Sequence, residues 1–136
     1  MVRITTFDHV GIRVSDAPTA LAFYRKLGFE IDPRYSNDRV AEVIAPSGVR
    51  LNLIFNAVRD PTRHNILLDD PVKKAGYTHA AFVVDKLQTV LDWAAVEGVA
   101  ITEGPVNWER RLTCFLRDPD GNVLEFNELL DGERLA

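Results

Sequence analysis

The chain carries an internal repeat, and this repeat constrains its fold more than any other feature of the sequence. Residues 9–14 read HVGIRV and residues 79–84 read HAAFVV, 70 positions later. Residues 46–53 (PSGVRLNL) and 119–126 (PDGNVLEF) form a second matched pair, now 73 positions apart. Three single matches share the first offset: Leu21 with Leu91, Gly28 with Gly98, and Ile31 with Ile101. The chain is therefore predicted to contain two copies of one folding unit.

The hydrophobic pattern predicts the same β-α-β-β-β order in each copy, and hence an α+β fold. Near the start, Val10, Ile12 and Val14 alternate with other residues as in a half-buried strand, and a helix start signal follows at Asp16 and Pro18. The first copy is predicted to have a strand at 4–14, a helix at 17–27 and strands at 30–35, 40–45 and 50–55. The second is predicted to have a strand at 77–84, a helix at 87–97 and strands near Ile101, at 112–117 and at 123–127.

The predicted organisation is a single domain, residues 1–136, in which two modules follow one another. The modules cover 4–56 and 77–127, a polar linker covers 57–76, and a tail covers 128–136. The net charge of −4 argues against a nucleic-acid partner, and no segment is apolar enough for a signal peptide or a membrane span. We expect a cytoplasmic protein with neither nucleic-acid nor membrane partners.

Four polar residues occupy matched positions in the two copies: His9 with His79, and Asn52 with Glu125. Because strand side chains alternate, all four are predicted to point away from the helices, toward the concave face of each sheet. Two cupped mixed sheets in pseudo-twofold relation would bring them together. Two imidazoles and a carboxylate suit a divalent ion such as Zn, Ni, Co, Mn or Fe. The alternative is that each histidine makes only a structural hydrogen bond, which would leave the inward Glu125 to find another partner.

Other chemically useful residues are open to two interpretations. Arg13 and Arg50 share the concave parity, where they would either form salt bridges at the rim or anchor a substrate carboxylate. His64 has no counterpart in the second copy, so a surface role is expected. Cys114, the single cysteine, has the parity of the helix-covered face and is expected in the core. Trp108 would either close the cavity or pack, and packing is the prediction.

Four motifs carry a resemblance to a known family: DHVGIRV at 8–14, FYRKLGF at 23–29, Thr78-His79, and DPDGNVLE at 118–125. In these motifs the chain resembles the vicinal oxygen chelate superfamily, which includes glyoxalase I, extradiol dioxygenases, fosfomycin-resistance proteins and bleomycin-binding proteins. The resemblance implies paired βαβββ modules cupped around a metal ion held by His9, His79 and Glu125. It also implies a homodimer in which each site draws on both chains.

Within that family, glyoxalase I (lactoylglutathione lyase) is the activity that the chain resembles most. Arg13 and Asn56 match its glutathione-binding residues, while Asn52 stands where glyoxalase I has a ligand glutamate. The resemblance thus implies a metal-dependent lyase or isomerase that moves a proton through a metal-bound enediolate, with glutathione as co-substrate. Glu125 would be both ligand and general base, and Arg50 and Asn52 would join the substrate contacts. The loss of one carboxylate at Asn52 leaves a two-histidine, one-glutamate set.

Three alternatives use the same fold. An extradiol-type dioxygenase would hold Fe(II) on the same three ligands. A thiol transferase that acts on an epoxide antibiotic would use the same two histidines and glutamate for its metal ion. A non-catalytic antibiotic-binding protein, like the bleomycin resistance relatives, would need no metal. Those binding relatives generally lack the metal ligands, which this chain keeps as His9, His79 and Glu125. The sequence therefore favours an enzyme with a small-molecule substrate.

Overall fold

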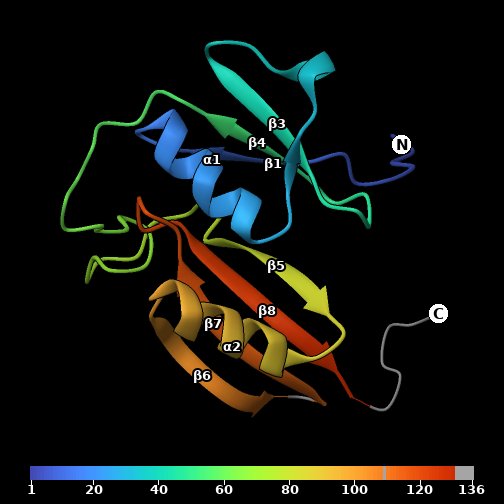
Figure 1. Cartoon of the computed structure of the whole chain (residues 1–136), viewed down its shortest axis with the longest axis vertical. Helices are drawn as coiled ribbons and strands as arrows, with labels where there is room; N and C mark the ends of the chain where they lie inside the picture. Colours follow the sequence, from blue (N-terminus) through green and yellow to red (C-terminus); the bar gives the residue numbers. More distant parts are fainter. Residues whose placement is uncertain (109, 131–136) are drawn as a thin grey trace. The chain divides into compact units, whose positions relative to one another are not determined.

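The structure, a computed structural model, describes residues 1–108 and 110–130. The chain divides into two compact units, Met1–Thr62 and Arg63–Ala136. Each unit has one α-helix and a four-stranded mixed sheet, coloured blue to green in the first and yellow to red in the second (Figure 1). The predicted α+β fold with two similar βαβββ halves is confirmed.

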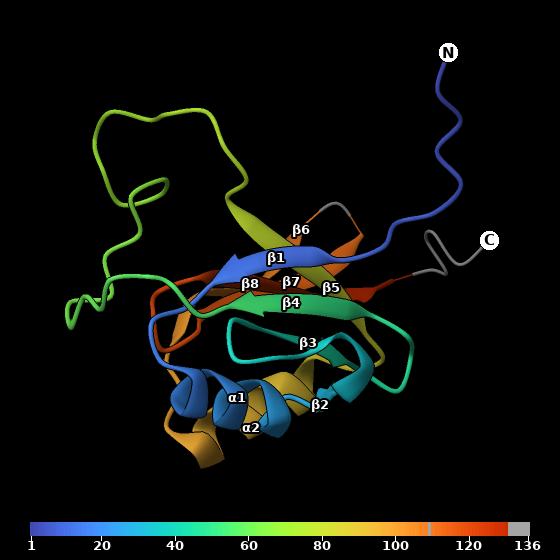
Figure 2. The ribbon, with the colours of Figure 1, turned by 90° about the horizontal axis from the view of Figure 1, so that it is seen from above.

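In the first unit the strands lie in the order β1-β4-β3-β2. β1 is parallel to β4, and the other neighbours are antiparallel. Its elements are β1 (Val10–Arg13), α1 (Ala17–Lys26), β2 (Glu30–Ile31), a 3₁₀ turn (Pro33–Tyr35), β3 (Val40–Ile44) and β4 (Arg50–Ile54). Figure 2 shows α1 along one face of this sheet. The helix begins where Asp16 accepts a hydrogen bond from the backbone N–H of Thr19 over 3.0 Å, as the capping signal predicts.

The second unit repeats this arrangement strand for strand, in the order β5-β8-β7-β6. Its elements are β5 (His79–Val84), α2 (Leu87–Glu97), β6 (Ile101–Trp108), β7 (Arg111–Arg117) and β8 (Val123–Leu129). α2 packs against β7 and β8 (Figure 1). The register is repeated as well, because Gly11 pairs with Asn52 in the first sheet and Ala81 pairs with Glu125 in the second. Residues matched in sequence are thus matched in position within their sheets.

Side-chain alternation divides each sheet into a helix-covered face and an open face. In the second unit the helix-covered face is the core, and its side chains are almost fully buried: Cys114, Leu116, Leu124 and Phe126. The first unit is built in the same way from Ile12, Ala41, Val43, Leu51 and Leu53. The polar residues singled out in the sequence have the parity of the open faces, as predicted.

Several boundaries differ from the prediction. The first strand begins only at Val10, because its neighbour β4 pairs with it from Leu51 onward and no strand of the described residues pairs with residues 4–9. The predicted strand at 30–35 ends at Ile31, since Asp32 caps a 3₁₀ turn that starts at Pro33. The strand near Ile101 extends to Trp108, and the last strand extends to Leu129. Of the predicted tail, residues 131–136 lie outside the described residues.

The part of the predicted linker that belongs to the second unit is held against the β7–β8 turn. Both guanidinium Nη atoms of Arg117 pair with the carboxylate of Asp69 at 2.6 Å, and Arg63 donates to the carbonyl oxygen of Asp118 over 2.6 Å. The Arg117 guanidinium keeps the pKa of Asp69 well below its usual range. Figure 2 shows this green to yellow-green segment without helix or strand. Among the helices of the described residues, none has the length and apolar character to span a membrane.

Candidate functional site

His79 and Glu125 form the centre of a candidate site on the open face of the second sheet. His79 starts β5 and Glu125 lies in the middle of β8, the parallel neighbour of β5. The Nε2 atom of His79 is 3.1 Å from Oε1 of Glu125, and the two side chains are 30% and 14% exposed. The structure thus brings together two of the three predicted metal ligands.

Both side chains have a second polar partner. The hydroxyl of Thr78 lies 2.8 Å from Nδ1 of His79, and Asn127 donates from Nδ2 to Oε2 of Glu125 over 2.6 Å. The edge of the His79 ring also meets Phe115, with the ring centroids 5.5 Å apart. His79 and Glu125 are therefore fixed in orientation from both sides.

The hydrogen bonds continue one residue further into the sheet. Thr113 donates from its hydroxyl to Oδ1 of Asn127 over 2.7 Å, and the two residues are only 1% and 4% exposed. Neither residue was predicted from the sequence. A signal was present, because Asn127 lies two positions after Glu125 on the same strand and so shares its face.

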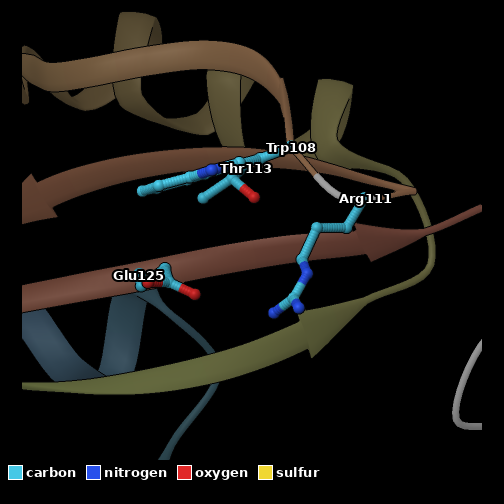
Figure 3. Close-up of a pocket in the computed structure, with 4 residues that line it drawn as sticks. All are labelled: Trp108, Arg111, Thr113 and Glu125. Atoms are coloured by element: carbon cyan, nitrogen blue, oxygen red, sulfur yellow. The ribbon is translucent and has the colours of Figure 1, made fainter.

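A cavity of about 230 Å³ opens beside Glu125. It is lined by Trp108, Arg111, Thr113 and Glu125, whose side chains Figure 3 draws. The register places all four on one face, since Trp108 pairs with Arg111 and Thr113 pairs with Asn127. The prediction that Trp108 packs was wrong, because its side chain lines this cavity and the residue is 52% exposed. Arg111 was not predicted.

The first unit holds the remaining predicted ligand, His9, just before β1. Its Nδ1 atom lies 2.8 Å from Oδ1 of Asp8, and its side chain is 38% exposed. Histidine ligands commonly donate one ring N–H to a carboxylate and offer the other nitrogen to the metal. The contact between Nδ1 of His9 and Asp8 is therefore suited to a histidine that would bind a metal ion through Nε2.

Two predicted substrate contacts of the first unit touch one another. Arg13 donates from Nε to Oδ1 of Asn56 over 2.8 Å. The contact arises because β1 and β4 are parallel, so Arg13 at the end of β1 and Asn56 just beyond β4 reach the same edge of the sheet. At this edge the side-chain amide of Asn56 therefore fixes the orientation of the Arg13 guanidinium.

Arg50 forms salt bridges, which is one of the two roles predicted for it. Its Nη1 atom lies 2.6 Å from Glu42 and 3.1 Å from Asp32. A hydrogen bond from Arg34, together with a weaker effect of Arg50, holds the pKa of Asp32 well below its ordinary value. Burial acts in the opposite direction but does not outweigh them. With its Nη1 atom committed to two carboxylates, a substrate contact through Arg50 stays a prediction.

Asn52 differs from its counterpart Glu125. Its Oδ1 atom is buried and, within the part of the chain that the structure describes, accepts no hydrogen bond. A buried acceptor without a donor is unusual and costs free energy. The predicted role of Asn52 as a substrate contact would supply that donor.

Two further predictions agree with the structure. Cys114 is fully buried, and desolvation raises the pKa of its thiol to about 11, so it is a core residue. His64 lies at the surface, where its Nε2 atom is 2.5 Å from the carboxylate of Asp70. Neither residue joins the candidate site.

The chemistry of the donors fits a divalent ion, although the structure does not show a complete ligand set. Among residues 1–108 and 110–130, no three histidine, cysteine, aspartate or glutamate side chains form a group that could hold a metal ion. The 3.1 Å separation of His79 Nε2 from Glu125 Oε1 matches that of two adjacent ligands, each about 2.1 Å from one ion. The three-residue site with His9, His79 and Glu125 stays a prediction.

Known proteins resemble this chain over nearly its whole length. The metallothiol transferase FosB of Staphylococcus epidermidis (strain ATCC 12228) is 27% identical over 130 residues, which cover 93% of this chain and 83% of that protein. The solved glyoxalase family protein from Enterococcus faecalis is 25% identical, with a TM-score of 0.69 over 90% of this chain and 97% of that one. TnmS3, an antibiotic binding protein from Streptomyces sp. CB03234, is 21% identical and shares the fold, with a TM-score of 0.68 over 95% and 99% of the two chains.

The family match covers both halves of the chain. The sequence model of one superfamily matches residues 6–126, from before His9 to just beyond Glu125. It thus includes all four motifs on which the predicted resemblance depends. The chain belongs to the Glyoxalase/Bleomycin resistance protein/Dioxygenase superfamily.

Proposed function

We propose that this chain is a divalent-metal-dependent transferase that adds a small thiol to an electrophilic substrate such as an epoxide. The observation that carries the proposal is the single carboxylate of the candidate site: Glu125 lies beside His79, whereas the matched position holds Asn52. Proton transfer between adjacent carbons, as in glyoxalase I, calls for carboxylate bases at the metal, and thiol addition does not. The similarity to a metallothiol transferase supports the same choice.

His9, His79 and Glu125 are the proposed ligands. When bound, the ion would act as a Lewis acid that polarises an oxygen of the substrate. In the reaction a sulfur–carbon bond forms and a carbon–oxygen bond of the strained ring breaks. The oxygen takes the electron pair of that bond and the proton that the thiol loses, so the step needs no oxidant or reductant.

The residues of the chain would orient the two reactants. Arg13, held by Asn56, would bind the carboxylate of the thiol, since a guanidinium fits a carboxylate with two parallel hydrogen bonds. The cavity beside Glu125 would hold the electrophile, with Trp108 and Arg111 along its wall. Its volume of about 230 Å³ suits a small molecule.

Glyoxalase-type isomerisation is the second candidate, and the contact between Arg13 and Asn56 favours it. The resemblance assigns both residues to glutathione, and they lie together at one edge of the first sheet. In that reaction Glu125 would take a proton from one substrate carbon and return it to the next. Glutathione would then be the co-substrate.

One set of measurements tests these proposals. The purified protein is loaded separately with Zn, Ni, Co, Mn and Fe, and its bound metal is measured. Each form is then assayed for loss of free thiol with an epoxide, using glutathione and cysteine, and for thioester formation from a hemithioacetal. His79→Ala should abolish activity, whereas His64→Ala, a surface control, should retain it.

The outcomes separate the candidates. Metal-dependent thiol addition that His79→Ala abolishes supports the transferase, and thioester formation without thiol addition supports the glyoxalase-type reaction. Ring cleavage of a catechol by the Fe(II) form, with neither of the other reactions, would identify a dioxygenase. Protein that binds no stoichiometric metal after reconstitution would contradict all three and leave an antibiotic-binding role.

We also propose a homodimer in which His9 of one copy completes the site of the other. Mixing His9→Ala protein with Glu125→Gln protein tests this arrangement, because a mixed dimer would hold one intact site and one with both substitutions. Random mixing should then restore about a quarter of the wild-type activity. No recovery, with mixed dimers detected by mass spectrometry, would contradict shared sites.

A further inference from the structure

A short chain of hydrogen bonds holds the carboxylate of Glu125 from inside the second sheet. Thr113 donates to Oδ1 of Asn127 over 2.7 Å, and Asn127 donates from Nδ2 to Oε2 of Glu125 over 2.6 Å. Thr113 and Asn127 are 1% and 4% exposed, so water has little access to either. We refer to these two residues as the Thr113–Asn127 pair.

The direction of these hydrogen bonds follows from the chemistry of the groups. An ionised carboxylate only accepts, so Asn127 must turn its NH₂ group toward Glu125 and its carbonyl oxygen toward Thr113. The Thr113 hydroxyl must then donate. Oε2 of Glu125 is thereby held within the sheet, while Oε1 faces Nε2 of His79 at 3.1 Å. The pair determines which oxygen is presented to the site.

The pair is built into the strands, not into loops. Thr113 and Asn127 are directly opposite in the antiparallel pairing of β7 with β8, and Glu125 lies two residues before Asn127 on the same face. Sites supported by packed side chains on strands hold their geometry better than sites on loops. The orientation of Glu125 is therefore fixed by strand register.

The first unit provides an internal comparison. There the position of Glu125 is taken by Asn52, and the residues that correspond to Thr113 and Asn127 are Val40 and Ile54, which pair in the same register. The same strand pairing therefore forms with two apolar residues at these positions. Where it does so, Oδ1 of the neighbouring Asn52 has no hydrogen-bond partner within the described residues. The polar pair accompanies the carboxylate and is not required by the fold.

We propose that Thr113 and Asn127 are positioning residues that hold Glu125 in the orientation in which it binds a divalent ion. This inference rests on the proposed function, since it assumes that Glu125 is a metal ligand. Residues that hydrogen-bond to a metal ligand typically contribute about 10- to 100-fold to metal affinity. The pair should therefore act on metal binding much more than on folding.

The experiment replaces the pair by its counterpart from the first unit. Thr113→Val removes the hydroxyl at nearly constant volume, Asn127→Ile removes the amide, and the double variant reproduces the apolar pair. Thr113→Ser retains the hydroxyl and serves as the conservative rescue. Thr102→Val is the matched control, because Thr102 also donates a hydrogen bond within this sheet, to the carbonyl oxygen of Phe115, without reaching Glu125.

Three quantities are measured: the dissociation constant for Co²⁺ by calorimetry, the absorption spectrum of bound Co²⁺, and the thermal unfolding midpoint of the metal-free protein. Thr113→Val and Asn127→Ile should each weaken Co²⁺ binding about 10- to 100-fold and alter the spectrum. The double variant should lose little more than the worse single variant, because both act through one carboxylate. Thr113→Ser and Thr102→Val should bind as the wild type does.

Wild-type affinity and spectrum in both Thr113→Val and Asn127→Ile would overturn the inference alone. The same holds if affinity falls only in step with the unfolding midpoint of the metal-free protein, since the role would then be structural. Wild-type protein that binds no divalent ion would overturn the inference together with the proposed function.

Discussion

Arg13 donates a hydrogen bond from Nε to the side-chain oxygen of Asn56, which lies 43 residues further along the chain. The contact joins the end of β1 to the segment that follows β4, and the parallel pairing of these strands makes it local in space. It fixes the plane of a guanidinium at the edge of a sheet. A charged, oriented donor of this kind is suited to a carboxylate.

Replacement of Arg13 by Met should weaken binding of the thiol substrate. Hydrogen bonds to charged groups contribute about 1.5–3 kcal/mol, so we expect KM for glutathione to rise about 10- to 100-fold with little change in kcat. Asn56→Ala should act in the same direction but less strongly. Steady-state kinetics with glutathione and with a thiol that has no carboxylate would check this. Arg39→Met is the control, because Arg39 is an exposed arginine of the same unit just before β3. An equal effect of Arg13→Met on both thiols, or an effect as large from Arg39→Met, would contradict the assignment.

Metal should stabilise the wild-type protein but not Glu125→Gln. At a free metal concentration about 100 times its dissociation constant, binding should raise the free energy of unfolding by about 2.7 kcal/mol. Thermal unfolding with and without Zn²⁺ measures the effect. Glu103→Gln, an exposed glutamate on β6 of the same sheet, is the matched control and should keep the full stabilisation. A Glu125→Gln protein that retains the wild-type increase would exclude Glu125 as a ligand.

Acid should weaken the attachment of the linker to the β7–β8 turn. The Arg117 guanidinium lowers the pKa of Asp69 in the folded chain, so the unfolded chain takes up this proton first as the pH falls. The stabilisation is therefore present above the unfolded pKa of about 4 and is lost as the pH falls toward the lower folded value. Denaturant titrations between pH 7 and pH 2 should show a smaller acid loss in Asp69→Asn, which starts less stable. Asp38→Asn, which replaces an exposed aspartate of the first unit, is the control and should lose as much stability in acid as the wild type does. An acid loss in Asp69→Asn equal to that of the wild type would contradict this role of Asp69.

Gly121→Ala should destabilise the chain more than Gly28→Ala. Both glycines have positive φ values, +86° and +108°, at which an alanine costs about 1–2 kcal/mol. At Gly121 a Cβ would in addition collide with the backbone carbonyl of Arg63, whose carbon it would approach to 2.9 Å. At Gly28 it would meet nothing within 4 Å. Midpoints of chemical denaturation measure the difference, and equal losses would show that the linker shifts freely.

The repeat was sufficient to predict the order of helix and strands along the chain, because both copies carry the same pattern of apolar residues and turn signals. Once His9 was matched to His79, alternation along the strands predicted the open faces and the parity of Glu125 and Cys114. Arg13 and Asn56 were identified from the resemblance to glyoxalase I, and the structure adds that they lie in contact.

What the sequence did not predict depends on cross-strand pairing. Thr113 and Asn127 meet only because β7 and β8 pair in one register, and a shift by one residue would place them on opposite faces of the sheet. Trp108 was given the wrong role and Arg111 was missed, because the strand after Ile101 is interrupted by irregular pairing and was not recognised as extending to Trp108. The pattern of one strand contains no information on its neighbour's alignment.

The single sulfhydryl of this chain is Cys114, sealed on the helix-covered side of β7 with a thiol pKa of about 11. For a protein proposed to handle reactive small thiols, that placement means that it brings no accessible thiol of its own to compete with the substrate. It should neither form mixed disulfides with its co-substrate nor be alkylated by the electrophile while folded. Any sulfur consumed in an assay then reports turnover and not self-modification.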